Sequence, residues 1–173
     1  MTSDLTLRFP YVLFHNSFLT EVQDDVTIGA GSRVGSFTLI HKGARIGRNC
    51  TIGSHCNICH CQIGDNVSIQ TGCHITNGVV IEDNAFIGPG VITLNDPLVP
   101  SKPLKAPAIR QGAKIGGGSI LLPGVVVGRK VIVGSGGIVV KDVPDGQTVI
   151  GYSVRVLREK CADIEGTIED ETT

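Results

Sequence analysis

Residues 26–58 read VTIGAGSRVGSFTLIHKGARIGRNCTIGSHCNI and carry an aliphatic side chain at every sixth position. In this stretch the aliphatic positions are Ile28, Val34, Ile40, Ile46, Ile52 and Ile58. A fixed short period indicates a solenoid, in which each repeat packs only on its neighbours. The period extends back to Val22, resumes at Ile63 after one residue is dropped near Cys59, and returns between Ile115 and Val139.

Small residues and glycines divide each six-residue unit into a short strand and a corner. A small or medium side chain stands two positions before the aliphatic, and side chains two apart in a strand share a face, so both point inward. Gly often follows the aliphatic, where the chain must turn without a Cβ clash. Three such units would close a triangular coil of about 18 residues that stacks on the next coil at about 4.8 Å. The sequence therefore predicts an all-β fold, a parallel β-helix.

Composition agrees with this fold and excludes several functions. Aromatic residues make up 4% of the 173 residues and Trp is absent, so aliphatic side chains must fill the interior. The formal net charge of −1 gives no sign of nucleic-acid or membrane-surface binding. We find no secretion signal and no apolar run near the roughly 18 residues that cross a bilayer. We therefore expect a cytoplasmic protein with reduced cysteines.

One segment, residues 94–112, lacks the period and contains four prolines: Pro97, Pro100, Pro103 and Pro107. It is predicted to be a loop extruded from the β-helix. Loops of this length are uncommon unless they bind or cover something, which favours a functional role. We expect residues 1–155 to form the β-helix domain and residues 156–173 to form a C-terminal extension with an acidic tail.

The hexads, the extruded loop and residues 120–144, ILLPGVVVGRKVIVGSGGIVVKDVP, together resemble the hexapeptide-repeat acyltransferases. That resemblance implies a left-handed β-helix, which periodicity alone does not reveal. Residues 32–47 and 81–90 are most similar to the sugar-nucleotide 3-N-acetyltransferases. The resemblance thus implies acetyl-CoA as acyl donor and a nucleotide-linked amino sugar as acceptor. It also implies a homotrimer with sites between subunits and no metal.

A polar column is predicted where the loop begins. Threading the hexads places Ile40, Ile58, Ile75 and Thr93 on one wall, so that the residues two positions later also stack: Lys42, His60, Asn77 and Asn95. By resemblance, Asn95 lies in the active site with Asn77 beside it. An amide accepts no proton at neutral pH, so the role of Asn95 would be to hold the acceptor amine or the thioester carbonyl. The alternative is that Asn95 satisfies turn backbone beside Pro97.

A proton acceptor is needed for the attacking amine, and His74 is the candidate because it precedes an inward residue and so points outward. The resemblance leaves open that the departing CoA sulfur takes the proton instead. We assign substrate binding to His60, Glu82 and Asp96.

The basic coils after the loop are the expected site for the CoA phosphates, with contributions from Lys141 and Arg155. The resemblance implies that the pantetheine arm runs along these coils, and Gly116 and Gly134 are assigned to its path because small residues permit close approach. As corner glycines they also have a purely structural explanation.

Two other functions remain open. The γ-type carbonic anhydrases share the hexads and bind zinc through histidines, and His55, His60 and His74 are the histidines that could serve. Four of the cysteines occupy the small inward position and behave as buried hydrophobic residues, which argues against a zinc site: Cys50, Cys56, Cys61 and Cys73. An acetyltransferase that acts on a non-sugar acceptor is the other alternative.

Overall fold

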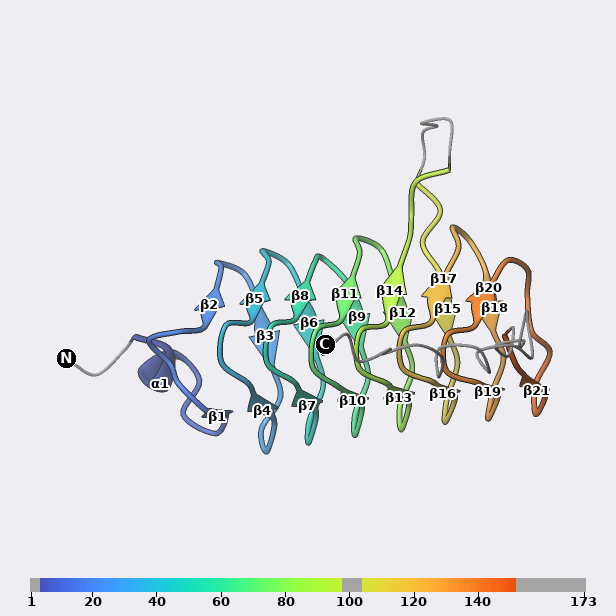
Figure 1. Ribbon diagram of the computed structural model, residues 1–173. Coiled ribbons are helices and arrows are strands. Elements are labelled where there is room, and N and C mark those ends of the chain that lie inside the picture. The colour runs from blue at the N-terminus through green and yellow to red at the C-terminus, as the bar shows by residue number, and fades with distance from the viewer. Residues whose placement is uncertain (1–3, 98–103, 152–173) are drawn as a thin grey trace, which may run out of the picture.

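The computed structural model describes residues 4–97 and 104–151. They form one short helix and a stack of two-residue parallel strands arranged as a triangular prism (Figure 1). The predicted all-β, left-handed parallel β-helix is confirmed. Because the strands of one coil belong to three different sheets, each strand pairs with strands of the coils before and after it.

Three parallel sheets form the walls of the prism. Sheet A contains β1 (Leu13–Phe14), β4 (Arg33–Val34), β7 (Thr51–Ile52), β10 (Ser68–Ile69), β13 (Phe86–Ile87), β16 (Lys114–Ile115), β19 (Ile132–Val133) and β21 (Thr148–Val149). Sheet B contains β2 (Glu21–Val22), β5 (Leu39–Ile40), β8 (Asn57–Ile58), β11 (His74–Ile75), β14 (Ile92–Thr93), β17 (Ile120–Leu121) and β20 (Ile138–Val139). Sheet C contains β3 (Thr27–Ile28), β6 (Arg45–Ile46), β9 (Gln62–Ile63), β12 (Val80–Ile81), β15 (Ala108–Ile109) and β18 (Val126–Val127).

The corners form three edges that run along the prism. The A–B edge follows the strands of sheet A, the B–C edge follows those of sheet B, and the C–A edge follows those of sheet C. A residue's edge is therefore given by the strand that precedes it.

The register brings residues about one coil apart into vertical contact, as predicted. In sheet B, Ile40 pairs with Ile58 and Ile58 with Ile75. All three side chains are fully buried, so the wall on which the predicted site depends is confirmed. Thr93 continues this wall at the level where the loop begins. Its buried hydroxyl donates to the carbonyl of His74 at 3.3 Å and accepts from the amide of Thr76 at 2.9 Å.

The extruded loop ends earlier than predicted. It leaves the prism after β14 and returns before β15, which lies inside the predicted range 94–112 (Figure 1). The strand pairs with β12 on one side and β18 on the other, and Ile109 is fully buried. Ile109 stands six residues before Ile115, so the period resumes one hexad sooner than expected. The reason is that Pro107 occupies the small inward position and made this hexad resemble loop.

The N-terminal end carries an element that the period does not predict, the helix α1 (Asp4–Arg8). Arg8 is its last residue, and the guanidinium donates to the carbonyls of Val22 and Gln23 at 3.0 and 2.6 Å. The helix thereby attaches to the first coil. In the part of the chain that the structure describes, no helix has the length and apolar character needed to cross a membrane. The predicted extension, residues 156–173, lies outside the described residues.

We predict that Ile75→Asp abolishes the cooperative thermal transition, because it places an unpaired charge in the wall shared by several coils. Circular dichroism during heating measures this. The matched variant Ile75→Val should lower the free energy of unfolding by only about 1 kcal/mol. A transition of Ile75→Asp near that of the parent chain would contradict the burial of this wall.

Candidate functional site

Two asparagines on the B–C edge join the stem of the extruded loop to the preceding coil, which is the neighbouring coil on the N-terminal side. Below, "above" means toward the N-terminal end of the prism and "below" means toward the C-terminal end. The side-chain amide of Asn95 donates to the carbonyl of Asn77 at 2.9 Å, and the backbone amide of Lys105 donates to the carbonyl of Asn95 at 3.0 Å. The side-chain oxygen of Asn77 accepts from the backbone amide of His60 at 3.0 Å. Of the predicted column of Lys42, His60, Asn77 and Asn95, the last three are joined by hydrogen bonds, whereas the backbone amide of Lys42 donates to Gln23. The bond to Asn77 gives Asn95 a structural role in closing the loop stem.

His60 is exposed at the same edge and lies against Gly43 in the coil above. A Cβ at Gly43 would stand 3.3 Å from the His60 ring, so the glycine gives the imidazole room. A small cavity of about 100 Å³ adjoins His60 and is lined in part by Gln62 and Gly78. Gln62 also lines an open groove of about 490 Å³ that crosses sheet C and reaches Glu82. Gln62 thus lines both the cavity at His60 and the groove that reaches Glu82.

Glu82 lies at the far end of this groove, on the C–A edge, and not beside Asn95. Its carboxylate accepts from Arg110 at 2.7 Å and from the backbone amide of Gln111 at 2.9 Å. The hydrogen bond from Arg110 comes first among the causes that lower the pKa of Glu82. Glu82 is therefore an anion at neutral pH, suited to bind a donor group and not to release a proton. Asp96 is exposed in the loop, one residue beyond Asn95.

His74 is exposed at the start of β11, on the outer face of sheet B, whereas Asn77 lies on the B–C edge. Its neighbours along the face are Asn57 above and Ile92 below. Beside His74, a contact that the sequence pattern did not reveal joins Nε2 of His41 to Oδ1 of Asn57 at 2.7 Å. Because an amide oxygen only accepts, Nε2 of His41 donates this hydrogen bond. Because β5 and β8 are paired in adjacent coils, the repeat could have predicted that His41 and Asn57 lie close together.

The residues assigned to CoA lie on different edges. Gly116 and Gly134 follow sheet A, whereas Lys141 follows sheet B. A Cβ on Gly116 would stand 2.4 Å from the backbone nitrogen of Ser135, so coil packing already requires this glycine. Arg155 lies outside the described residues.

A groove of mixed charge lies beside Lys141, across the last strand of sheet C. An open groove of about 470 Å³ is lined by Arg110 and Arg129, together with Asp142 and Asp145. Asp142 also lines a shallower groove that contains Lys141. Arg129 and Lys141 thus lie on the two edges that flank β18, each with an aspartate in the same groove.

A zinc site would require several histidines to converge, but the candidate histidines lie on different parts of the prism. His55 precedes β8 on the A–B edge, His60 follows β8 on the B–C edge, and His74 lies on the face of sheet B. Within residues 4–97 and 104–151, no group of three or more His, Cys, Asp or Glu side chains is placed to hold a metal ion. Burial raises the pKa of the Cys61 thiol to about 12, which keeps it protonated at neutral pH. A protonated thiol is a poor zinc ligand.

Comparisons with known proteins agree with the repeat. The family model described as "Bacterial transferase hexapeptide (six repeats)" matches residues 25–60 and 60–95. The bifunctional protein GlmU of Synechococcus elongatus is 30% identical over 138 residues, which cover 80% of this chain and 30% of that protein. The chain therefore spans about 30% of the length of this curated relative.

Two solved structures are similar over most of the chain. WeeI of Acinetobacter baumannii AYE is 26% identical with a TM-score of 0.52, covering 80% of this chain and 55% of that one. PerB of Caulobacter crescentus, solved with CoA and GDP-perosamine, is 25% identical with a TM-score of 0.50, covering 82% of this chain and 55% of that one. Together with the family model, they confirm the predicted resemblance to the hexapeptide-repeat acyltransferases.

We predict that the purified protein binds far less than one zinc ion per chain, since its histidines do not converge and the pKa of the Cys61 thiol is raised by burial. Inductively coupled plasma mass spectrometry of protein produced in zinc-supplemented medium measures this. Zinc near one ion per chain, together with turnover of bicarbonate, would instead support the carbonic anhydrase alternative.

Proposed function

We propose that this chain, which carries the hexapeptide repeat of bacterial transferases, is an acyl-CoA-dependent N-acyltransferase that acetylates the amino group of a nucleotide-linked amino sugar. The observation that carries the proposal is the polar column of His60, Asn77 and Asn95 at the stem of the extruded loop. Beside this column, Gln62 lines both the cavity at His60 and a groove that crosses sheet C to Glu82. Support comes from PerB, which was solved with CoA and a nucleotide-linked amino sugar.

The acceptor is proposed to lie along the groove that joins His60 to Glu82. Sugar hydroxyls and amines donate hydrogen bonds, and the anionic carboxylate of Glu82 accepts them. His60 offers a second polar contact at the other end, and Asp96 is proposed to contribute a further carboxylate from the loop. A carboxylate fixed by Arg110 stays in one orientation, which favours a defined position of the substrate.

Acyl transfer requires a neutral amine to attack the thioester carbonyl while its proton is accepted elsewhere. We propose that His74 accepts this proton, with His41 and Asn57 as a polar neighbouring pair on the same face. Asn95 and Asn77 are proposed to position the reacting groups by holding the loop stem at a fixed height. Backbone amides at the tight corners would supply donors to the developing oxyanion.

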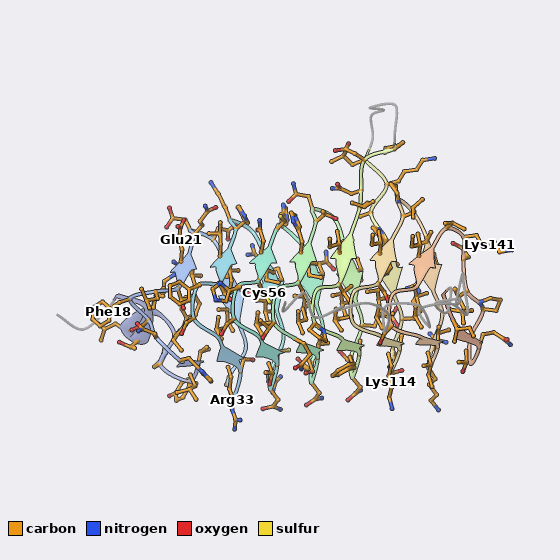
Figure 2. The ribbon with its side chains drawn as sticks, in the orientation of Figure 1. Phe18, Glu21, Arg33, Cys56, Lys114 and Lys141 are labelled. Carbon is orange, nitrogen blue, oxygen red and sulfur yellow. The ribbon has the colours of Figure 1, made fainter. Side chains whose placement is uncertain are left out.

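The acyl donor is proposed to be acetyl-CoA, with its phosphates near the basic groups on either side of β18. Lys141 lies on the B–C edge and Arg129 on the C–A edge. Figure 2 shows Lys141 near the C-terminal end of the prism and Lys114 on the side of sheet A. We further propose a homotrimer in which sites lie between neighbouring prisms, and a cytoplasmic location.

We predict that acetyl-CoA and a nucleotide-linked amino sugar release free thiol, and that Asn95→Ala lowers kcat by about tenfold or more through loss of positioning. Thiol release detected with a chromogenic disulfide measures the rate. Asn95→Asp removes the same donor to Asn77 with little change in shape, and a melting curve is recorded for both variants. A loss of melting temperature without a fall in kcat would leave Asn95 with only its role in the loop stem.

We predict that Lys141→Ala weakens CoA binding about two- to fivefold at low ionic strength, and that the difference shrinks as salt is added. Titration calorimetry at two salt concentrations measures this. Lys114→Ala is the matched control, since it removes an exposed lysine from sheet A. Equal CoA affinity of Lys141→Ala and the parent chain at low salt would remove Lys141 from the phosphate site.

A further inference from the structure

Two exposed aromatic rings are stacked on the A–B edge, away from the column of Asn77 and Asn95. The rings of Phe37 and His55 lie 4.9 Å apart between centroids, with an angle of 13° between their planes. The side chain of Phe37 is 55% exposed, and His55 is exposed as well. Neither ring fills the core, so hydrophobic burial in this chain does not explain the stack.

Both rings stand at a backbone position that disfavours them. The φ angles of Phe37 and His55 are 58° and 56°, in the left-handed region that bulky residues seldom adopt. The following coils carry glycine at the equivalent position, with φ angles of 73° at Gly72, 66° at Gly90 and 68° at Gly118. The aromatic stack therefore stops before the coil of Gly72, which has no side chain at this position of the edge.

The space beside Gly72 is open. A Cβ at Gly72 would meet only the backbone nitrogen of Gly90, at 4.0 Å. Coils rise by about 4.8 Å, which matches the 4.9 Å between the rings of Phe37 and His55. A flat ring beside Gly72 would thus continue the stack at the same spacing, against the face of His55 that Phe37 does not cover.

Polar residues flank Gly72 in the sequence. Thr71 precedes Gly72 on the edge and is exposed. His74 begins β11 two residues later, and the side chain of Gln70, whose amide donates to Ser68 at 2.8 Å, follows β10. A ring with hydrogen-bonding groups on its rim is therefore a better match than a plain hydrocarbon ring.

We propose that the ring slot formed by His55, Thr71 and Gly72 binds the base of a nucleotide, stacked on the open face of His55. Bases are flat and have a π-face, and stacking on an aromatic side chain contributes to the binding of every base type. The slot itself follows from geometry. Only the source of the base rests on the proposed function, which supplies two: the nucleoside diphosphate of the acceptor and the adenine nucleotide of CoA.

The test fills the slot with a side chain. Asn tolerates a positive φ, so Gly72→Asn should fold and place its amide where the third ring would lie. Gly118→Asn is the matched control, because Gly118 has a similar φ of 68° on the same edge and nothing within 4 Å of its added Cβ. His55→Ala removes the stacking surface without filling the slot.

Full-length protein and the three variants are titrated calorimetrically with TDP, UDP and GDP, with adenosine 3′,5′-diphosphate, and with ribose 5-phosphate, which has no base. We expect Gly72→Asn and His55→Ala to weaken the binding of one nucleotide class by about tenfold. Gly118→Asn should leave it unchanged, and ribose 5-phosphate should not discriminate among the proteins. Loss for the nucleoside diphosphates assigns the slot to the acceptor, and loss for the adenosine compound assigns it to CoA.

Equal affinities of the parent chain and Gly72→Asn for all nucleotides would overturn the proposal. It would also be overturned if the loss occurred only together with a changed sedimentation coefficient, since the stack would then be a contact between subunits. Thiol release is measured separately. A parent chain that binds nucleotides through the slot but releases no thiol would refute the proposed function and leave the slot standing.

Discussion

In-register stacking of inward aliphatic side chains is the constraint on which the rest of the molecule depends. Each strand has only two residues, and a single coil cannot bury its own interior face. Vertical pairs such as Ile58 and Ile75 therefore hold the coils together, and every outward residue takes its position from them. The coil that is one residue short keeps the register because the missing residue is absorbed in the corner at Cys59–Cys61, before β9 resumes the pairing.

The residues at the corners differ from coil to coil, whereas the strands of the walls pair in register throughout. Backbone groups that a corner leaves unpaired are satisfied by side chains of the next coil, as when Asn77 accepts from the amide of His60. Asp65 and Asp83 do the same on the C–A edge, where each accepts from a backbone amide of the preceding coil. Asn95 extends this pattern to the loop, so one residue type serves both architecture and candidate site. This double role explains why side-chain identity alone does not separate the two.

The single prism leaves several surfaces without a partner inside the described chain. On the outer face of sheet B, polar Asn57 and His74 give way to the partly exposed Ile92 and then to Ile138, which is 60% exposed. An apolar surface below a polar one fits the proposed trimer, in which a neighbouring prism would cover the aliphatic side chains and complete a site beside the polar ones. The stacked rings of Phe37 and His55 lie on a different part of the molecule, the A–B edge.

The sequence by itself determined the period, the inward side chains and the vertical wall of Ile40, Ile58 and Ile75, because a six-residue repeat makes spatial neighbours calculable from position. It also predicted the column of Asn77 and Asn95. The tertiary structure alone decided where the loop ends, since Pro107 concealed a hexad, and that Glu82 lies across sheet C from the loop stem. It also revealed the stack of Phe37 and His55, because the repeat predicts levels along the prism but not the direction of a side chain at a corner. Those directions depend on the left-handed φ angles of the turns and on the side chains of the next coil.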